Sequence, residues 1–203
     1  MHLSEGVLHT PTLIAGYVIA IVGMTIGLKK IEGQKLPLVA LFAAAFFVAG
    51  TIHIPVGVGS VHLILNGIAG LFLGWAVFPA FLIALVLQLL LFSFGGFSVL
   101  GVNLCIMALP AVAVHYLLKP YFIENATNKR LGIIGGLSGV IGVGGAAMLA
   151  SLVLALDGGA TYLHLIGLLL ISHLPVFVVD SLISISILTL LVKMRASIYH
   201  ETV

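Results

Sequence analysis

Long apolar runs separated by short polar breaks fill the chain and predict a bundle of membrane-spanning helices. A spanning helix needs about 20 apolar residues, and seven runs approach that length. The runs cover about Thr12–Leu28, Leu36–Ile54, Val61–Trp75, Val77–Phe94, Val99–Leu118, Leu131–Leu156 and Thr161–Leu191. The breaks carry glycine, proline, asparagine or charged residues, which are typical of turns. The pattern therefore predicts an all-α, polytopic membrane helix bundle with seven transmembrane helices.

The composition agrees with a membrane protein and excludes several other classes. Hydrophobic residues make up 62% of the 203 positions, charged residues only 7%, and the mean hydropathy is +1.33. A soluble domain has about a quarter of its residues charged. A single cysteine, Cys105, excludes a disulfide scaffold, and eight scattered lysines and arginines form no basic stripe for nucleic acid.

With seven spans, all eight basic side chains fall on one side of the bundle. They are Lys29, Lys30, Lys35, Lys119, Lys129, Arg130, Lys193 and Arg195. The positive-inside rule makes this side cytoplasmic, so we expect the amino terminus outside and the carboxyl terminus inside. One membrane domain then fills residues 1–203, with an outer segment at 1–11, the bundle at about 12–191 and a cytoplasmic tail at 192–203. The opening residues lack the features of a signal peptide, so we expect the mature chain to begin at Met1.

The outer segment opens with residues that can chelate a metal ion. The Met1 amine, the His2 amide nitrogen and the His2 Nδ1 atom can close a five-membered and a six-membered ring around one ion. Three nitrogens in one plane suit square-planar or tetragonal ions such as Ni(II) and Cu(II), and Co(II) can use the same donors. A histidine at position 2 is weak evidence by itself, since about one chain in forty has it by chance.

His62 is the candidate for the fourth donor. We expect Ser60 to cap the third helix, which places His62 in the first turn at the outer face. The positive end of the helix dipole favours a neutral imidazole, the form that binds metals. Asn66, one turn deeper, either orients His62 or forms an interhelical hydrogen bond. Without His2, a capping or interfacial role would be the simpler interpretation of His62.

Three further polar side chains near the outer face each have two interpretations. His53, at the end of the second run, either lies at the entry to the site or has a structural role. Glu5 either supports the donors or is an ordinary interfacial carboxylate. His9 is expected to face solvent, because Thr10 as the cap and Pro11 at the first helical position explain the local pattern without a function.

The last apolar run contains His173, Pro175 and Asp180. A helix over Thr161–Leu191 is about 46 Å long, so it must tilt, project from the bilayer or break near the proline. An ionisable group at membrane depth is costly and is a functional candidate. We expect Asp180 to pair with Ser181, Ser184 or a partner subunit.

Several motifs resemble the CbiM/NikM family. They are Met1-His2-Leu3-Ser4-Glu5-Gly6, the block from Ile52 to Gly57 through Ser60–Leu63 to Gly74-Trp75, and Phe94–Phe97 with Leu100–Asn103. The resemblance covers nearly the whole chain. It implies the substrate-binding (S) component of an energy-coupling factor (ECF) transporter for cobalt or nickel. The implied fold has six helices of the S-component type and one more at the amino terminus.

The resemblance also implies the ligands, the cargo and the partners. The ligands would be the Met1 amine, the His2 amide nitrogen and side chain, and the His62 side chain. The cargo would be Co(II) or Ni(II), with no prosthetic group, and His53 resembles CbiM proteins used for cobalt rather than nickel-type relatives. The partners would be a CbiQ-like T component, paired CbiO-like ABC-type ATPases and a small CbiN-like subunit. The location would be a bacterial or archaeal plasma membrane, with supply to cobalamin synthesis.

Two rival functions fit smaller parts of the sequence. Gly136-Leu137-Ser138-Gly139 fits the G-x-S-G loop of an intramembrane serine protease, with His164 or His173 as the base. This motif is common in a chain with 24 glycines, so we expect no enzyme. An ATP-independent metal permease is the second rival, and it would be expected to carry more carboxylates along its path than Asp180 alone.

Overall fold

Helices account for most of the computed structural model, which describes residues 2–56, 59–122 and 127–201. Seven α-helices follow one another in these ranges: α1 (Thr10–Lys29), α2 (Leu36–Thr51), α3 (Asn66–Leu73), α4 (Val77–Phe92), α5 (Leu100–Leu118), α6 (Asn128–Gly158) and α7 (Leu163–Glu201). Strands β1 (His53–Val56) and β2 (Gly59–His62) form a small antiparallel sheet between α2 and α3. Four short 3₁₀ turns complete the elements: η1 (Gly33–Lys35), η2 (Gly74–Ala76), η3 (Lys119–Tyr121) and η4 (Gly159–Tyr162).

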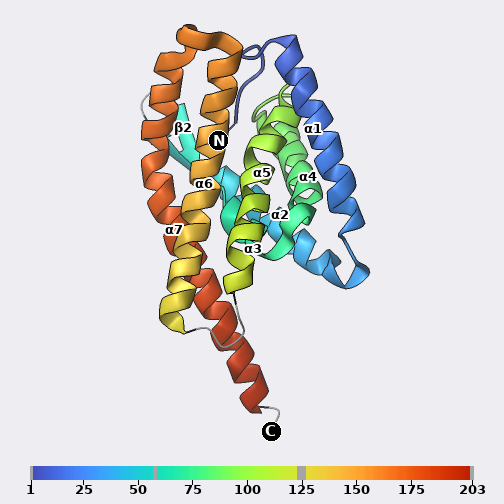
Figure 1. Ribbon diagram of the computed structural model, residues 1–203, viewed down its shortest axis with the longest axis vertical. Helices are drawn as coiled ribbons and strands as arrows, with labels where there is room; N and C mark the ends of the chain where they lie inside the picture. Colours follow the sequence, from blue (N-terminus) through green and yellow to red (C-terminus); the bar gives the residue numbers. More distant parts are fainter. Residues whose placement is uncertain (1, 57–58, 123–126, 202–203) are drawn as a thin grey trace.

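Five helical segments of the described chain are long and apolar enough to cross a membrane. Two of the five contain two α-helices each, Asn66–Phe92 with α3 and α4 and Asn128–Leu191 with α6 and α7. The α6–α7 segment folds back at Gly159, where φ is +54°, and its two helices lie side by side (Figure 1). The protein is therefore a multi-pass membrane protein. The count of seven spans stays a prediction.

The predicted third helix is wrong in its first half. The prediction ran one helix over Val61–Trp75 with Ser60 as its cap, whereas Ser60 and Val61 belong to β2 and α3 begins at Asn66. Val61 and His62 pair with β1, and Leu65 adopts a left-handed conformation with φ of +54°, so the helix begins only at Asn66. The eight residues of α3 extend only about 12 Å, so α3 cannot cross a bilayer alone. The fold is thus helical as predicted, apart from this hairpin.

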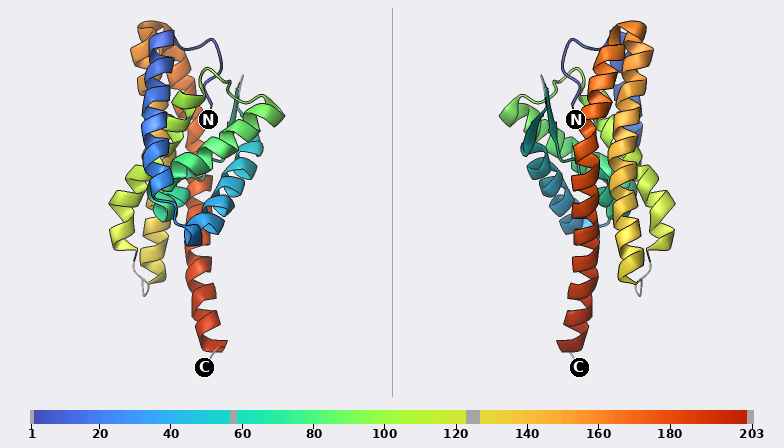
Figure 2. Two further views of the ribbon diagram at one scale, coloured as in Figure 1. Left: turned by 90° about the vertical axis from the view of Figure 1, so that its right-hand side faces the viewer. Right: turned by 90° about the vertical axis from the view of Figure 1, so that its left-hand side faces the viewer.

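Helix α7 projects from the molecule instead of breaking at its proline. It stays α-helical through Pro175 as far as Glu201, so its backbone includes much of the predicted tail. Its last turns extend beyond the other helices, at the end where the α1–α2 turn and the start of α6 lie (Figures 1 and 2). The segments with the eight basic residues therefore gather at this one end of the molecule.

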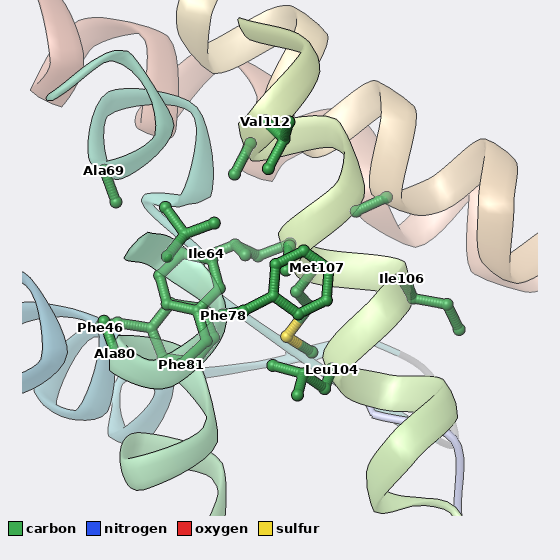
Figure 3. Close-up of a cluster of buried hydrophobic side chains, with 14 of the residues drawn as sticks. Phe46, Ile64, Ala69, Phe78, Ala80, Phe81, Leu104, Ile106, Met107 and Val112 are labelled. Atoms are coloured by element: carbon green, nitrogen blue, oxygen red, sulfur yellow. The ribbon is translucent and has the colours of Figure 1, made fainter. Parts of the chain in front are cut away.

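The deepest part of the core lies where α2, α4 and α5 meet the segment before α3 (Figure 3). The rings of Phe46 and Phe81 stack there with their centroids 4.1 Å apart, and Ile64, Leu104 and Met107 surround them with little or no exposed surface. The outward faces of the helices expose leucine and isoleucine, as expected for helices that contact lipid. This packed core includes Ile64, which lies between the hairpin and α3.

Helix α3 lies in close backbone contact with α5 and α6. A Cβ atom added at Gly67 would be 1.8 Å from the Ser138 carbonyl oxygen of α6, and one at Gly70 would be 2.0 Å from the Ala111 oxygen of α5. Only glycine allows such an approach, as is common between helices in membranes. Asn66, at the start of α3, donates from Nδ2 to the oxygens of Met107 and Gly142. These contacts fix the position of α3.

Candidate metal site

The segment before α1 turns back into the molecule and is held there by hydrogen bonds (Figure 2). Asn103 of α5 accepts from the Leu3 amide at 2.9 Å and donates to the Leu3 oxygen at 3.0 Å. The Tyr162 hydroxyl donates to the Val7 oxygen at 2.5 Å. Glu5 accepts from the Ser98 amide at 2.9 Å. Residues near the amino terminus are usually poorly ordered unless tied down, so these bonds define a fixed place for His2.

Both ring nitrogens of His2 contact other side chains. Its Nε2 atom is 3.0 Å from Oε1 of Gln88, a residue of α4 with no exposed surface. The Gln88 amide nitrogen donates to the oxygens of Phe46 and Phe47 in α2, so Oε1 is oriented as an acceptor. His2 therefore donates from Nε2, and a neutral His2 has its lone pair on Nδ1.

His62 ends strand β2 and is 97% buried, with 3% of its surface exposed. Its Nδ1 atom is 2.9 Å from the Leu63 oxygen, which only accepts, so Nδ1 carries the proton and Nε2 carries the lone pair. The prediction of a helical first turn for His62 is wrong, because the residue lies in the hairpin. Its backbone is paired in the ladder with that of His53.

The two lone pairs converge on one point. Nδ1 of His2 and Nε2 of His62 are 3.0 Å apart, and the ring centroids are 4.9 Å apart. Two lone pairs at this separation repel unless a cation, either a proton or a metal ion, lies between them. Divalent metals bind imidazole nitrogen at about 2.0–2.1 Å, as zinc does, so two donors at neighbouring square-planar corners are about 2.8–3.0 Å apart. The pair has the geometry of two adjacent metal ligands.

Two other predicted site residues, Glu5 and Asn66, make their described hydrogen bonds away from the imidazole pair. Glu5 is an exposed anchor for the loop at Ser98, and Asn66 bonds to α5 and α6 instead of orienting His62 through any hydrogen bond of the described residues. Met1 lies outside the described residues, as does the side chain of His53. No group of three or more His, Cys, Asp or Glu side chains in the described residues could hold a metal ion.

Gln88 and Asn103 are site residues that the sequence analysis missed. Each is an uncharged polar residue inside an otherwise apolar run, and each is buried to at least 98%. A signal was present, since polar side chains in membrane helices are costly unless they are bonded. That signal does not reveal the bonding partner, so neither residue could be assigned to His2 or Leu3.

His9 faces solvent as predicted, with 71% of its side chain exposed. Its Nδ1 atom is 2.9 Å from Asp157 at the end of α6, and Asp157 also bonds to Thr12. His9, rather than Thr10, is the residue that precedes the first turn of α1. The contact joins the start of α1 to the end of α6, away from the imidazole pair.

The residues of the serine protease rival do not form a catalytic site. Ser138 lies inside helix α6 with no exposed surface, and its hydroxyl donates to the Gly135 oxygen of the same helix. His173 is bonded through Nδ1 to the Leu169 oxygen of its own helix. A nucleophile needs a histidine within hydrogen-bond distance, and the described residues place none beside Ser138.

Comparison with known proteins identifies the family. The profile of the cobalt uptake substrate-specific transmembrane region, CbiM, matches residues 2–198. A protein of Haemophilus influenzae described as a metal transport protein is 64% identical over 202 residues, covering 100% of this chain and 98% of the relative. The cobalt transport protein CbiM of Clostridioides difficile is 27% identical over 95% of this chain and 82% of its own.

A fused relative and one solved structure extend the comparison. The fused nickel transport protein NikMN of Rhodobacter capsulatus is 34% identical over 160 residues, which make up 74% of this chain and 46% of that longer protein. The crystal structure of a truncated transition metal transporter has the same fold, with a TM-score of 0.79 and 22% identity over 96% of this chain and 99% of the other. The chain therefore belongs to the CbiM family, whose members are membrane transport components rather than enzymes.

Proposed function

We propose that the protein is the S component of an ATP-driven ECF importer that captures Co(II) or Ni(II) at the outer face of the membrane. The convergence of His2 Nδ1 and His62 Nε2 at 3.0 Å carries this proposal. Both opposite nitrogens are engaged, to Gln88 and to Leu63, so the two lone pairs are directed at one ion. The metal is the cargo, and the protein needs no prosthetic group.

Four nitrogens complete the proposed coordination. In the chelate formed by the Met1 amine, the His2 amide nitrogen and His2 Nδ1, the amide nitrogen occupies the middle corner of the square. The fourth corner is then next to His2 Nδ1, and the 3.0 Å separation of His62 Nε2 fits that corner. The amine and the amide release protons when they bind, so binding weakens in acid.

Ion selectivity must come from geometry, because the intrinsic order of affinities places Cu(II) above Ni(II) and Ni(II) above Co(II). A planar set of four nitrogens held by buried hydrogen bonds resists the change to a tetrahedral site that Zn(II) prefers. Relatives named for cobalt and for nickel both match this chain. We favour cobalt, for supply to cobalamin synthesis, because His53 resembles the cobalt-type CbiM proteins. We place His53 at the entry to the site.

The importer also needs partners that this chain does not provide. We propose a CbiQ-like T component, CbiO-like ATPases and a CbiN-like subunit in a bacterial or archaeal plasma membrane. Relatives named as the fusions CbiMQ and NikMN support this assignment. The gathering of basic residues at one end supports a cytoplasmic carboxyl terminus and an outer amino terminus.

Elemental analysis of purified protein tests the site. One extra residue ahead of Met1 moves the terminal amine, and His2→Ala removes one imidazole. We expect both variants to lose bound Co(II) or Ni(II), while His9→Ala, in the same segment with an exposed side chain, retains it. Wild-type metal content in both site variants would refute the proposal.

Uptake of radioactive cobalt into cells separates the importer from an ATP-independent permease. We expect efficient uptake only when the chain is produced with a CbiQ-like protein and a CbiO-like ATPase, and loss of uptake when the ATPase is inactive. Equal uptake by the chain alone would favour the permease.

A further inference from the structure

Asp180 is a buried carboxylate in α7 that bonds to the segment next to the metal site. Only 1% of its surface is exposed, and its Oδ2 atom accepts hydrogen bonds from the amides of Ile64 at 3.3 Å and Leu65 at 3.2 Å. The predicted partners Ser181 and Ser184 do not bond to it in the described residues, and Ser181 donates to Gly136 of α6 instead. A buried carboxylate is costly, so a contact of this kind requires an explanation.

The segment that Asp180 holds connects His62 to helix α3. His62 bonds through Nδ1 to the Leu63 oxygen, the next two amides bond to Asp180, and α3 begins at Asn66. The carboxylate therefore acts within two residues of the imidazole. It also accepts from amides near the start of a helix, where negative charge is favourable.

Leu65 has an unfavourable backbone conformation that needs such support. Its φ of +54° and ψ of 17° lie in the left-handed region, which residues with a Cβ atom rarely adopt. Leu65 is also the cap residue of α3, and its side chain offers no acceptor for the first helical amides. The turn is thus held from outside, by the Asp180 carboxylate.

We propose that Asp180 is a positioning residue for metal binding: through the Ile64 and Leu65 amides it holds the turn that places His62 Nε2 opposite His2 Nδ1. This inference rests on the proposed function. Asp180 then controls the geometry of the proposed metal site from within a membrane-spanning helix, and its carboxylate does not touch the ion. Because the contact needs only a hydrogen-bond acceptor of the right length, an asparagine can replace it.

Three substitutions at and near Asp180 test the inference through metal affinity measured by titration of full-length protein. Asp180→Leu removes the acceptor, and we expect it to bind Co(II) at least tenfold more weakly. Asp180→Asn keeps an acceptor oxygen, and we expect affinity within about threefold of wild type. Ser184→Ala, one turn further along α7, is the matched control and is expected to bind normally.

Three further measurements distinguish positioning of His62 from a general loss of stability. X-ray absorption of the residual metal in Asp180→Leu should show one fewer imidazole ligand. In a His62→Ala background, Asp180→Leu should cause no additional loss of affinity, because the residue acts through His62. Leu65→Gly removes the conformational cost at that residue, so it should recover part of the affinity lost in Asp180→Leu.

Each of these measurements has an outcome that would overturn the role of Asp180. Unchanged affinity in folded Asp180→Leu, or an equal additional loss in the His62→Ala background, would overturn the inference. So would a loss in Asp180→Asn as large as that of His62→Ala. If Asp180→Leu does not fold, Asp180→Ser, whose hydroxyl is too short to reach the turn, takes its place. Wild-type protein that binds no Co(II) or Ni(II) would contradict the proposed function instead.

Discussion

At the scale of single residues, the partners of the two site imidazoles decide what the imidazoles can bind. A histidine has two nitrogens, and a fixed acceptor at one of them makes the other a ligand. Gln88 provides this acceptor for His2, and the Leu63 oxygen provides it for His62. Substitution of residues that bond to metal ligands in this way typically costs about 10- to 100-fold in metal affinity.

Substitution of Gln88 is expected to weaken metal binding without removing a ligand. Gln88→Met keeps the volume but loses the acceptor for His2 Nε2, so the ring can turn or change its tautomer. We expect a loss of affinity of about tenfold or more by titration with Co(II). Gln88→Glu, protonated at the oxygen that faces the Phe46 and Phe47 carbonyls, keeps both the donor and the acceptor and should bind more tightly than Gln88→Met. Equal affinities of the two variants would contradict the role assigned to Gln88.

At the scale of secondary structure, α3 is the element on which the site geometry depends. It is short, and its glycines place its backbone against the backbones of α5 and α6. Asn66 joins its first turn to both of these helices. His62 ends β2 and is joined to the start of α3 by residues 63–65, so a displacement of α3 displaces the imidazole.

Gly67→Ala is expected to disturb this packing. The added methyl group would lie 1.8 Å from the Ser138 oxygen, so α3 and α6 must move apart. We expect a loss of roughly 1–3 kcal/mol in stability, or failure to fold, as measured by thermal unfolding in detergent. Gly132→Ala in α6 is the control, because a Cβ atom there meets nothing within 4 Å. A normal unfolding temperature for Gly67→Ala would contradict the close approach.

At the scale of the whole molecule, the two ends of the bundle differ in chemistry. One end carries the α1–α2 turn, the start of α6 and the projecting end of α7, with the basic residues in these segments. The other end carries η4 and the start of α1, near Asp157 and His9. The positive-inside rule therefore predicts that η4 faces the outside of the cell.

Cysteine labelling in intact cells tests this orientation. Thr161→Cys in η4 and Lys129→Cys near the start of α6 lie at opposite ends of α6, and both positions are exposed. We expect a membrane-impermeant thiol reagent to label only the first. The native Cys105 is buried, so it contributes little background. Labelling of Lys129→Cys alone would show that the orientation is reversed.

The sequence by itself determined the class of the protein and predicted the half of the proposed site that lies in one short segment. Apolar runs and breaks are local properties of the chain, and they located α1, α2, α4, α5 and α6 and the start of α7 to within a few residues. The predicted end of α7 was wrong, because the helix continues through the polar tail to Glu201. The proposed chelate of Met1 and His2 could be predicted without the fold, because its donors are neighbours in the chain. A sequence motif could also single out His62, but it could not show that His62 lies in a hairpin instead of a helix.

Only the tertiary structure decided how these parts meet. His2 and His62 are 60 residues apart, His2 and Gln88 are 86 apart, and Leu65 and Asp180 are 115 apart. A lone polar residue in an apolar helix needs a hydrogen-bond partner. These helices carry apolar residues on all sides, so the sequence pattern does not show which neighbour provides that partner. The packing of α3 against its neighbours makes that choice, since it fixes which buried acceptor lies opposite which donor.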